Sequence, residues 1–431
     1  MTDGKAFVQE LAGTDPQMPI GALQDHLRNK LVARFTDTLG DVNGVSRFIR
    51  NIADQALARG LDLHAITSTR FECPSQPNIH NLRPRWARPM PGYPQLDIVV
   101  PSSRGLARLA DRLRPDVVHI STPGPIGMAG RKWARKNGVP LVGTYHTDFP
   151  AYVEHLFDEP CLTWTCAKFM RWFYQPFARL FTRSADYGRA LERMGYPGDR
   201  IVRLIPGIDT EAFHSRHRDP TGAVWTNCPG VRPASVKVLY VGRVSVEKNL
   251  PLLAKVWPRV SQACRSRGID TQLLVVGDGP YKAPMTAALL DAGASAAACF
   301  LGFRHGRELS TIYATSDLFA FPSTTDTLGQ VVMEAQSAGL PVIVTDRGGP
   351  SEVVDDGHTG FVLSPDAVES WVEAIVRLIE DAILRHRMGA AAHLKIQPLA
   401  IARSFDHFWQ THIEVDAAPK PASASNRPRN R

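Results

Sequence analysis

Strand-like and helix-like patterns alternate along most of the chain, and this alternation restricts its fold more than any other feature. Two apolar runs, "VVHISTPGP" and "VPLVGTYHTD", flank the segment "GMAGRKWARKNG", which has the spacing of a helix. The connections between such segments are short and contain glycine. Alternation of this kind is typical of a parallel, doubly wound sheet, so we expect an α/β fold.

The alternation occurs twice in the 431 residues. It fills residues 29–213 and resumes over 235–413, where closing helices end it, whereas the intervening segment 214–234 shows neither pattern and is predicted to be a linker. We therefore expect two Rossmann-like domains that face each other across a cleft. Ligands bind outside the carboxyl ends of parallel strands, so this cleft is the predicted site.

The two ends of the chain lack these patterns. Residues 1–28 are predicted to be a mobile leader, and 414–431, which are rich in Pro, Ser and basic residues, a disordered basic tail. The N-terminus has no secretory-signal pattern, and no run of 18 apolar residues occurs. The six cysteines form no CxxC pair, which argues against disulfides and a zinc site. These features predict a cytoplasmic protein without a bound metal.

The net charge of +8 indicates a polyanionic partner, which is a nucleic acid, an anionic membrane surface or a phosphorylated substrate. Part of this charge lies in residues 166–184, "CAKFMRWFYQPFARLFTRS", which combine aromatic and basic side chains and contain no acidic one. Such a segment can lie on an anionic membrane surface. A helix that packs in the core and turns its arginines to water fits equally well.

Two basic residues follow a strand in "YVGRVSVEKNL". The strand ends at Gly242, and Arg243 and Lys248 lie five positions apart where the next helix begins. Two cations beside free helical N–H groups form a good clamp for a diphosphate. The alternative is a solvated loop in which Glu247 neutralises Lys248.

Two acidic residues, Asp326 and Glu334, stand with seven residues between them in "TTDTLGQVVMEAQSAGLPVIVTDRGGPSEVV". Glu334 could accept hydrogen bonds from a ribose diol, while the N–H groups near Leu328 and Gly329 would meet a phosphate or a sugar. The alternative is that Glu334 is an ordinary exposed residue of a helix, and for this residue alone that is the commoner case.

Taken together, these segments resemble a known family. The sequence "VGRVSVEKNL", the longer block "FPSTTDTLGQVVMEAQSAGLPVIVTDRGGPSEVVDDGHTGFVL", and "DVNGVSR", "PDVVHISTPGPIG", "YHTDFPAY" and "GYPGDRIVRLIPGIDTEAF" are similar to glycosyltransferase family 4. Within it they look nearest to bacterial glycolipid-type mannosyl- and glucosyltransferases. The resemblance spans about residues 32–395 in the expected order and implies the GT-B fold.

For the second half of the chain, the resemblance implies roles for four residues. Arg243 and Lys248 would hold the donor pyrophosphate, and Glu334 would bind the ribose hydroxyls. Asp326 occupies the first acidic place of the family's E-x7-E pattern and would contact the donor sugar. It is one methylene shorter than the usual Glu.

For the first half, the resemblance implies two further roles. Gly44 would let the backbone approach the diphosphate closely, where a side chain would intrude. His146, in "YHTDFPAY", would face the reacting sugar. The segment "LFTRSADY" stands where the family commonly has "VPS" at a strand end.

The resemblance implies a retaining transfer of mannose or glucose from a GDP- or UDP-hexose to a hydroxyl of a lipid or glycan. The donor would be a substrate, and no cofactor or metal would be needed, because cations would stabilise the leaving diphosphate. One alternative is a nucleotide-sugar 2-epimerase of the same fold, for which we identify no catalytic acids. The other is a basic nucleic-acid-binding protein. No helix-turn-helix or finger pattern supports it, so we expect no nucleic-acid partner.

Overall fold

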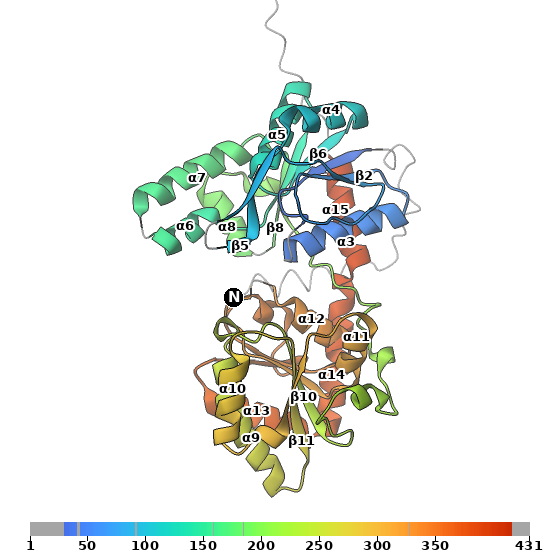
Figure 1. Ribbon diagram of the computed structural model, residues 1–431, viewed down its shortest axis with the longest axis vertical. Coiled ribbons are helices and arrows are strands. Elements are labelled where there is room, and N and C mark those ends of the chain that lie inside the picture. The colour runs from blue at the N-terminus through green and yellow to red at the C-terminus, as the bar shows by residue number, and fades with distance from the viewer. Residues whose placement is uncertain are drawn as a thin grey trace, which may run out of the picture. The chain divides into compact units, whose positions relative to one another are not determined.

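The chain forms two compact units in the computed structural model, which describes residues 30–40, 44–90, 93–157, 159–183, 185–326 and 328–415 (Figure 1). The C-terminal unit comprises Ile208–Ile401, and the N-terminal unit comprises the described residues before and after that range. The predicted leader and nearly all of the predicted tail lie outside the described residues.

A seven-stranded sheet forms the centre of the N-terminal unit, in the order β3-β2-β1-β6-β7-β8-β9. All of its neighbouring strands pair in parallel. The chain adds β2 and β3 on one side of β1 and then returns to add β6 to β9 on the other side, so the sheet is doubly wound. The strands are β1 (Val32–Phe35), β2 (Leu63–Thr67), β3 (Ile79–Asn81), β6 (Val117–Ile120), β7 (Leu141–Tyr145), β8 (Arg179–Thr182) and β9 (Ile201–Arg203).

Helices connect these strands, as the alternation of patterns predicts. A separate antiparallel hairpin, β4 (Trp86–Met90) with β5 (Tyr93–Val100), interrupts the series between β3 and β6. The helices are α3 (Gly44–Ala58), α4 (Ser103–Leu113), α5 (Pro125–Asn137), α6 (Phe149–Phe157), α7 (Pro160–Tyr174) and α8 (Ala185–Arg193).

The last described helix, α15 (Ile401–Ile413), packs on the N-terminal unit. Its Phe405, Phe408 and Trp409 are buried in one cluster with Val32 of β1 and Phe181 of β8. Figure 1 shows α15, in red, against the blue and green elements of this unit. The predicted boundary, which placed residues up to 413 in the second domain, differs from this, because helical periodicity does not indicate which sheet a helix covers.

The C-terminal unit contains a second parallel sheet, in the order β12-β11-β10-β13-β14-β15. The predicted α/β class with two doubly wound sheets is therefore confirmed. The strands are β10 (Val236–Val241), β11 (Thr271–Val276), β12 (Ala298–Gly302), β13 (Leu318–Phe321), β14 (Val342–Thr345) and β15 (Gly360–Leu363). The helices are α9 (Leu250–Ser266), α10 (Lys282–Asp291), α11 (Gly306–Thr315), α12 (Gln330–Ser337), α13 (Val368–Glu380) and α14 (Ala382–Ile396).

The segment predicted to be a linker, 214–234, belongs to the C-terminal unit. It forms two short 3-10 helices, and its Trp225 is only 3% exposed. His217 is also buried, with Nδ1 2.6 Å from Ser310 Oγ. Single buried side chains without a repeating spacing produce no periodic pattern, which is why the sequence alone indicated a linker.

The described part of the basic aromatic segment, residues 166–183, contains the end of α7 and the strand β8, with the break near Pro176. One side of α7 buries Met170, Phe173 and Tyr174, which confirms core packing for that side. Four large apolar residues of α7 are nevertheless exposed, namely Leu162, Trp164, Phe169 and Trp172. Within the described ranges, no helix combines the length and the apolar character that crossing a membrane requires.

Replacing Phe405 of α15 tests which unit this helix stabilises. Phe405 is fully buried against Trp409, so we expect Phe405→Ala to cost about 3–5 kcal/mol of unfolding free energy. Hydrogen exchange followed by mass spectrometry should become faster in peptides of the N-terminal unit. Leu394→Ala, on the exposed surface of α14, is the control. Faster exchange confined to the C-terminal unit would contradict the assignment of α15.

Candidate functional site

The carboxyl ends of β10 and β13 meet at one edge of the C-terminal sheet, because these two strands are parallel neighbours. The loop after β10 carries Arg243 and Lys248, and the loop after β13 carries Asp326. The structure joins the two loops directly, since Lys248 Nζ donates a hydrogen bond of 2.8 Å to Asp326 Oδ2. Both side chains are about one quarter exposed, at 23% and 25%.

Further hydrogen bonds hold these loops in place. Thr325 Oγ1 donates to the carbonyl oxygen of Glu247 over 3.0 Å, and the Tyr240 hydroxyl donates to the carbonyl oxygen of Arg243 over 2.8 Å. The guanidinium of Arg243 remains 66% exposed, and its contact with the Glu247 carboxylate is long, at 3.8 Å. The alternative in which Glu247 neutralises Lys248 is therefore wrong, since Asp326 is the carboxylate that pairs with Lys248.

The loop after β13 ends at Gly329, which directly precedes α12. Gly329 has φ +67, and a Cβ at this position would lie 2.8 Å from Pro350 Cγ, so only glycine fits. The amide of Gly349 holds the middle of the loop by donating to the carbonyl oxygen of Asp326 over 2.7 Å. Among the described residues, no side chain caps the N–H groups at the start of α12. Such groups are suited to an anionic ligand.

Glu334 lies on α12, as predicted, but it is not exposed. Only 2% of the residue is accessible, and its Oε2 accepts a hydrogen bond of 3.1 Å from the Tyr313 hydroxyl. The alternative of an exposed helix residue is therefore wrong. A buried carboxylate needs partners, and here the hydroxyl of Tyr313 fixes its orientation.

Of the remaining predicted residues, Leu328 directly precedes Gly329 in the loop after β13, whereas Gly44 and His146 belong to the N-terminal unit. Gly44 is the first residue of α3, and His146 directly follows β7. Both ring nitrogens of His146 are buried without a hydrogen-bond partner in the described part of the chain. Burial, and then the nearby Arg183 and Arg34, hold the pKa of His146 well below its ordinary value, so the imidazole is neutral at pH 7.

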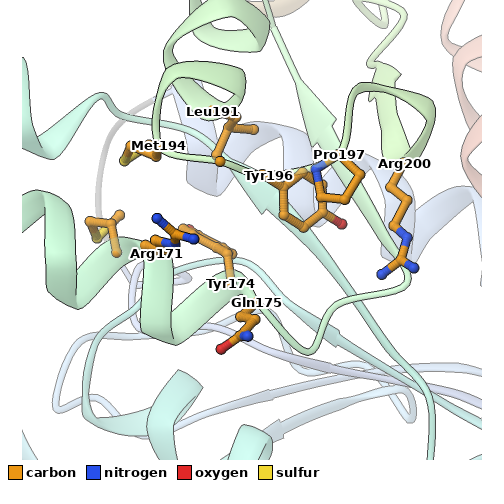
Figure 2. Close-up of a pocket in the computed structure, with 10 residues that line it drawn as sticks. Arg171, Tyr174, Gln175, Leu191, Met194, Tyr196, Pro197 and Arg200 are labelled. Atoms are coloured by element: carbon orange, nitrogen blue, oxygen red, sulfur yellow. The ribbon is translucent and has the colours of Figure 1, made fainter.

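Two hollows lie in the N-terminal unit, at opposite edges of its sheet. The first, of about 480 Å³, is lined by residues that follow the carboxyl ends of β1, β2 and β6, together with aromatic side chains of α6 and α7. The second, of about 310 Å³, lies between the end of α7 and the chain after α8, where Figure 2 shows Arg171, Tyr174 and Arg200. The second hollow adjoins the amino ends of β8 and β9. Only the first is at the edge where doubly wound sheets bind ligands.

Asp37, which the sequence did not single out, is held at the wall of the first hollow. Its carboxylate accepts hydrogen bonds from Thr122 Oγ1 over 2.6 Å and from the amide of Ile126 over 2.9 Å, at the start of α5. Burial raises the pKa of this carboxyl above its ordinary value. Its place directly after a strand, in "ARFTD", is the signal by which it could have been found.

Comparison with known proteins places this geometry in a family. The family model described as Glycosyltransferase Family 4 matches residues 42–212, and the model described as Glycosyl transferases group 1 matches 230–395. A GDP-mannose-dependent alpha-mannosyltransferase of Mycolicibacterium smegmatis is 30% identical over 370 residues, which cover 83% of this chain and 90% of that protein. The chain belongs to glycosyltransferase family 4.

Other relatives of this glycosyltransferase carry different names. Sulfoquinovosyl transferase SQD2 of Arabidopsis thaliana is 31% identical over 308 residues, which cover 70% of this chain but only 58% of that protein. Among solved structures, Anabaena Alr3699/HepE in complex with UDP superposes with a TM-score of 0.68 at 17% identity, covering 89% of this chain and 99% of HepE. The predicted GT-B fold and the predicted enzyme class, a hexosyltransferase, are confirmed.

Behind His146, the N-terminal unit of the glycosyltransferase contains two fully buried histidines, His119 of β6 and His412 of α15. His412 Nδ1 lies 2.6 Å from the carbonyl oxygen of Phe408, so it donates. His412 Nε2 then accepts from His119 Nδ1 over 2.8 Å, and His119 Nε2 accepts from the Thr144 hydroxyl over 3.1 Å. Both rings are therefore neutral, with fixed tautomers.

This histidine pair predicts a loss of stability in acid. Burial lowers the pKa of His412 to about 3, whereas the unfolded chain has the ordinary value of about 6.5. Between about pH 3 and pH 6.5, only the unfolded state binds a proton at His412. The contribution of this residue to the unfolding free energy is therefore greatest above about pH 6.5 and decreases as the pH falls below it. One such proton costs about 1.4 kcal/mol per pH unit.

We expect His412→Leu to be less stable than the wild type at pH 7, because it removes two buried hydrogen bonds. Its unfolding free energy should nevertheless fall less steeply between pH 6 and pH 4, by about one proton. Urea unfolding at several pH values measures both quantities. A slope as steep as that of the wild type would contradict the neutral, buried state of His412.

Proposed function

We propose that the protein transfers mannose or glucose, with retention of configuration, from a GDP- or UDP-hexose to a hydroxyl of a lipid or glycan. The Lys248–Asp326 ion pair at the carboxyl ends of β10 and β13 carries this proposal. Names of relatives support the donor class, among them the GDP-mannose-dependent mannosyltransferase of Mycobacterium tuberculosis and HepE with UDP-glucose. D-inositol 3-phosphate glycosyltransferase of Rhodococcus erythropolis is another relative, with a different acceptor in its name.

Lys248, Arg243 and the N-terminus of α12 provide positive charge for the leaving nucleotide diphosphate. Lys248 already has an anionic partner in Asp326, so the donor phosphate would replace that carboxylate as the partner of Lys248. Asp326 would then accept hydrogen bonds from the sugar hydroxyls. The positive groups stabilise the negative charge that develops on the diphosphate as the sugar leaves.

The remaining predicted residues position the donor. Glu334, oriented by Tyr313, would accept hydrogen bonds from the ribose hydroxyls. The backbone at Leu328 and Gly329 would meet the sugar or phosphate, and Gly44 would leave room for the diphosphate. His146 would present a neutral ring nitrogen to the reacting sugar.

In the proposed reaction, the bond from the anomeric carbon to the phosphate oxygen is replaced by a bond to the acceptor oxygen on the same face of the sugar ring. The acceptor oxygen forms a bond to that carbon while the bond to the phosphate oxygen breaks. The acceptor proton passes to the phosphate oxygen that leaves. In this proposal the nucleotide sugar is a substrate, and no cofactor or metal ion takes part.

The acceptor side lies in the N-terminal unit. The hollow of about 480 Å³ is mostly apolar, which suits a lipid-linked or ring-shaped acceptor. The exposed side of α7 carries Trp164, Trp172 and Lys168, with Lys168 Nζ 5.1 Å from the Trp164 ring centroid. Aromatic and basic side chains on one exposed helix favour attachment to an anionic membrane surface. We propose a cytoplasmic enzyme that binds peripherally to the inner face of the membrane.

Thermal unfolding with nucleotides tests the donor site. A nucleotide at one hundred times its dissociation constant should add about 2.7 kcal/mol of stability, and Lys248→Ala should remove this gain. The measurement uses UDP, GDP and ADP, alone and as sugar conjugates. Lys395→Ala is the matched control, because it breaks a similar ion pair, Lys395–Asp355, of the same length in the same unit. The proposed donor site would be refuted if no nucleotide stabilised the wild type. It would also be refuted if the nucleotides stabilised Lys248→Ala as much as they stabilise the wild type.

Vesicle sedimentation tests the membrane surface. We expect binding to phosphatidylglycerol vesicles and not to phosphatidylcholine vesicles, and at least a fivefold loss of binding in the double variant Trp164→Ala, Lys168→Ala. Phe303→Ala removes an aromatic residue of similar exposure (67%, against 62% for Trp164) in the C-terminal unit and should bind like the wild type. Equal binding of the double variant would exclude α7 as the membrane contact.

A further inference from the structure

Two arginines in the N-terminal unit, one fully and one partly buried, lack among the described residues the partners that such groups normally have. Arg34, the third residue of β1, is fully buried, and only its Nε has a partner, Ser121 Oγ at 2.8 Å. Its Nη1 and Nη2 have no hydrogen-bond partner among the described residues. The buried Nε of Arg183, which follows β8, is likewise without a partner in the described ranges.

These two arginines and His146 surround one aromatic ring, that of Phe48 in α3. The ring centroid lies 5.2 Å from Arg34 Cζ and 5.6 Å from Arg183 Cζ. The ring of His146 meets it edge-on, with 6.5 Å between the centroids. Phe408 covers Arg34 from a second side at 5.2 Å. Three polar groups with unused nitrogen atoms therefore lie in one cluster.

The cluster carries positive charge that nothing described in the structure neutralises. Burial, and then the neighbouring Arg183, lower the pKa of Arg34 to about 9, and burial lowers that of Arg183 to about 10. Both guanidiniums remain charged at pH 7. The described residues offer neither of them an ion pair, although aromatic rings contribute some cation–π attraction. A buried charge without a counter-ion costs several kcal/mol, so two adjacent ones need an explanation.

The position of the cluster suits a ligand. His146 and Arg183 come just after the carboxyl ends of the adjacent strands β7 and β8, and both are partly exposed, so the cluster reaches the surface of the unit. Phe48 stands near the start of α3, whose first turn contains no acidic residue. The positive end of this helix adds to the attraction for an anion.

We propose that Arg34, Arg183 and His146 form a binding site for an oxyanion, namely a phosphate, sulfonate or carboxylate group carried by a substrate. A guanidinium presents paired N–H groups that match such oxygens, and the bound anion would supply the missing counter-charge. This inference rests on the proposed transferase function and adds that one substrate is negatively charged beyond the nucleotide diphosphate. The residues differ from those proposed for the donor diphosphate on β10 and β13. The anionic group belongs either to the acceptor or to the sugar of the donor.

Thermal unfolding of the full chain in sulfate, phosphate and chloride at equal ionic strength tests the site. We expect sulfate and phosphate to raise the melting temperature of the wild type above that in chloride. Arg34→Met and Arg183→Met should reduce this difference to the general stabilisation that sulfate and phosphate give a folded protein without a binding site. Arg131→Met is the matched control, because Arg131 is also buried in this unit but donates to the carbonyl oxygens of Phe173 and Trp172. It should keep the difference.

Stability in chloride alone separates a binding role from a structural one. Arg34→Met should be as stable as the wild type or more stable, because it removes an uncompensated buried charge. Arg131→Met should be less stable, because it leaves two carbonyl oxygens without a donor. An Arg34→Met variant that is strongly destabilised in chloride, or a wild type that sulfate and phosphate do not stabilise, would overturn the proposal.

Matched pairs of compounds identify the source of the anion. Comparing UDP-glucuronic acid with UDP-glucose tests whether the anionic group belongs to the donor sugar. Comparing glucose 6-phosphate with glucose tests whether it belongs to the acceptor. In one pair, Arg34→Met should weaken binding of the charged member at least tenfold and leave the neutral member unchanged. If neither pair shows this difference, the assignment to a substrate is wrong. Nucleotide stabilisation that persists in Arg34→Met but not in Lys248→Ala would show that the donor site stands independently.

Discussion

Parallel pairing between strands that are distant in the chain brings the side chains of each proposed site to one edge of a sheet. In the C-terminal unit, β10 pairs with β13, so Lys248 meets Asp326 across 78 positions of sequence. In the N-terminal unit, β1 pairs with β6, and the same sheet continues to β7 and β8. His146 and Arg183 thereby follow neighbouring strand ends. Without this pairing, none of these groups would be close enough to act on one ligand.

The positive side chains of the two proposed sites have different partners. Lys248 is only partly buried and has a carboxylate partner, Asp326. In our proposal, a donor phosphate replaces this partner. Arg34 and Arg183 have no described carboxylate partner, and they are held by aromatic rings instead. An aromatic environment attracts a guanidinium weakly and leaves its N–H groups available. In both proposed sites a positive charge can bind an anion. Lys248 would exchange Asp326 for the anion, whereas Arg34 and Arg183 have no described carboxylate to exchange.

The last helix shows how stability and site are linked in the N-terminal unit. α15 supplies Phe408, which covers Arg34, and His412, which pairs with His119. The apolar residues of α15 are buried among those of β1, α3 and β8. This helix therefore both completes the hydrophobic core and forms part of the wall behind the arginine cluster. Its position explains why a segment so late in the chain affects the first sheet.

Much of the fold and part of the site could be predicted from local patterns. The period of the apolar residues determined the α/β class and the repetition of two sheets. Arg243 and Lys248 were singled out because they follow a strand, at the edge where parallel sheets bind ligands. The spacing of Asp326 and Glu334 around an apolar stretch drew attention to that pair, and the resemblance to glycosyltransferases added Gly44 and His146.

The tertiary structure alone decided the partners of these residues. In the structure, Lys248 pairs with Asp326 rather than with Glu247, and Glu334 is buried against Tyr313. The helix α15 packs on the first sheet. The tertiary structure also brought together Arg34 and Arg183, which the sequence separates by 149 positions. Periodicity reports which side of an element is buried, but not which distant element covers it. That choice depends on the order of strands in the sheet, which only the packing of the whole unit determines.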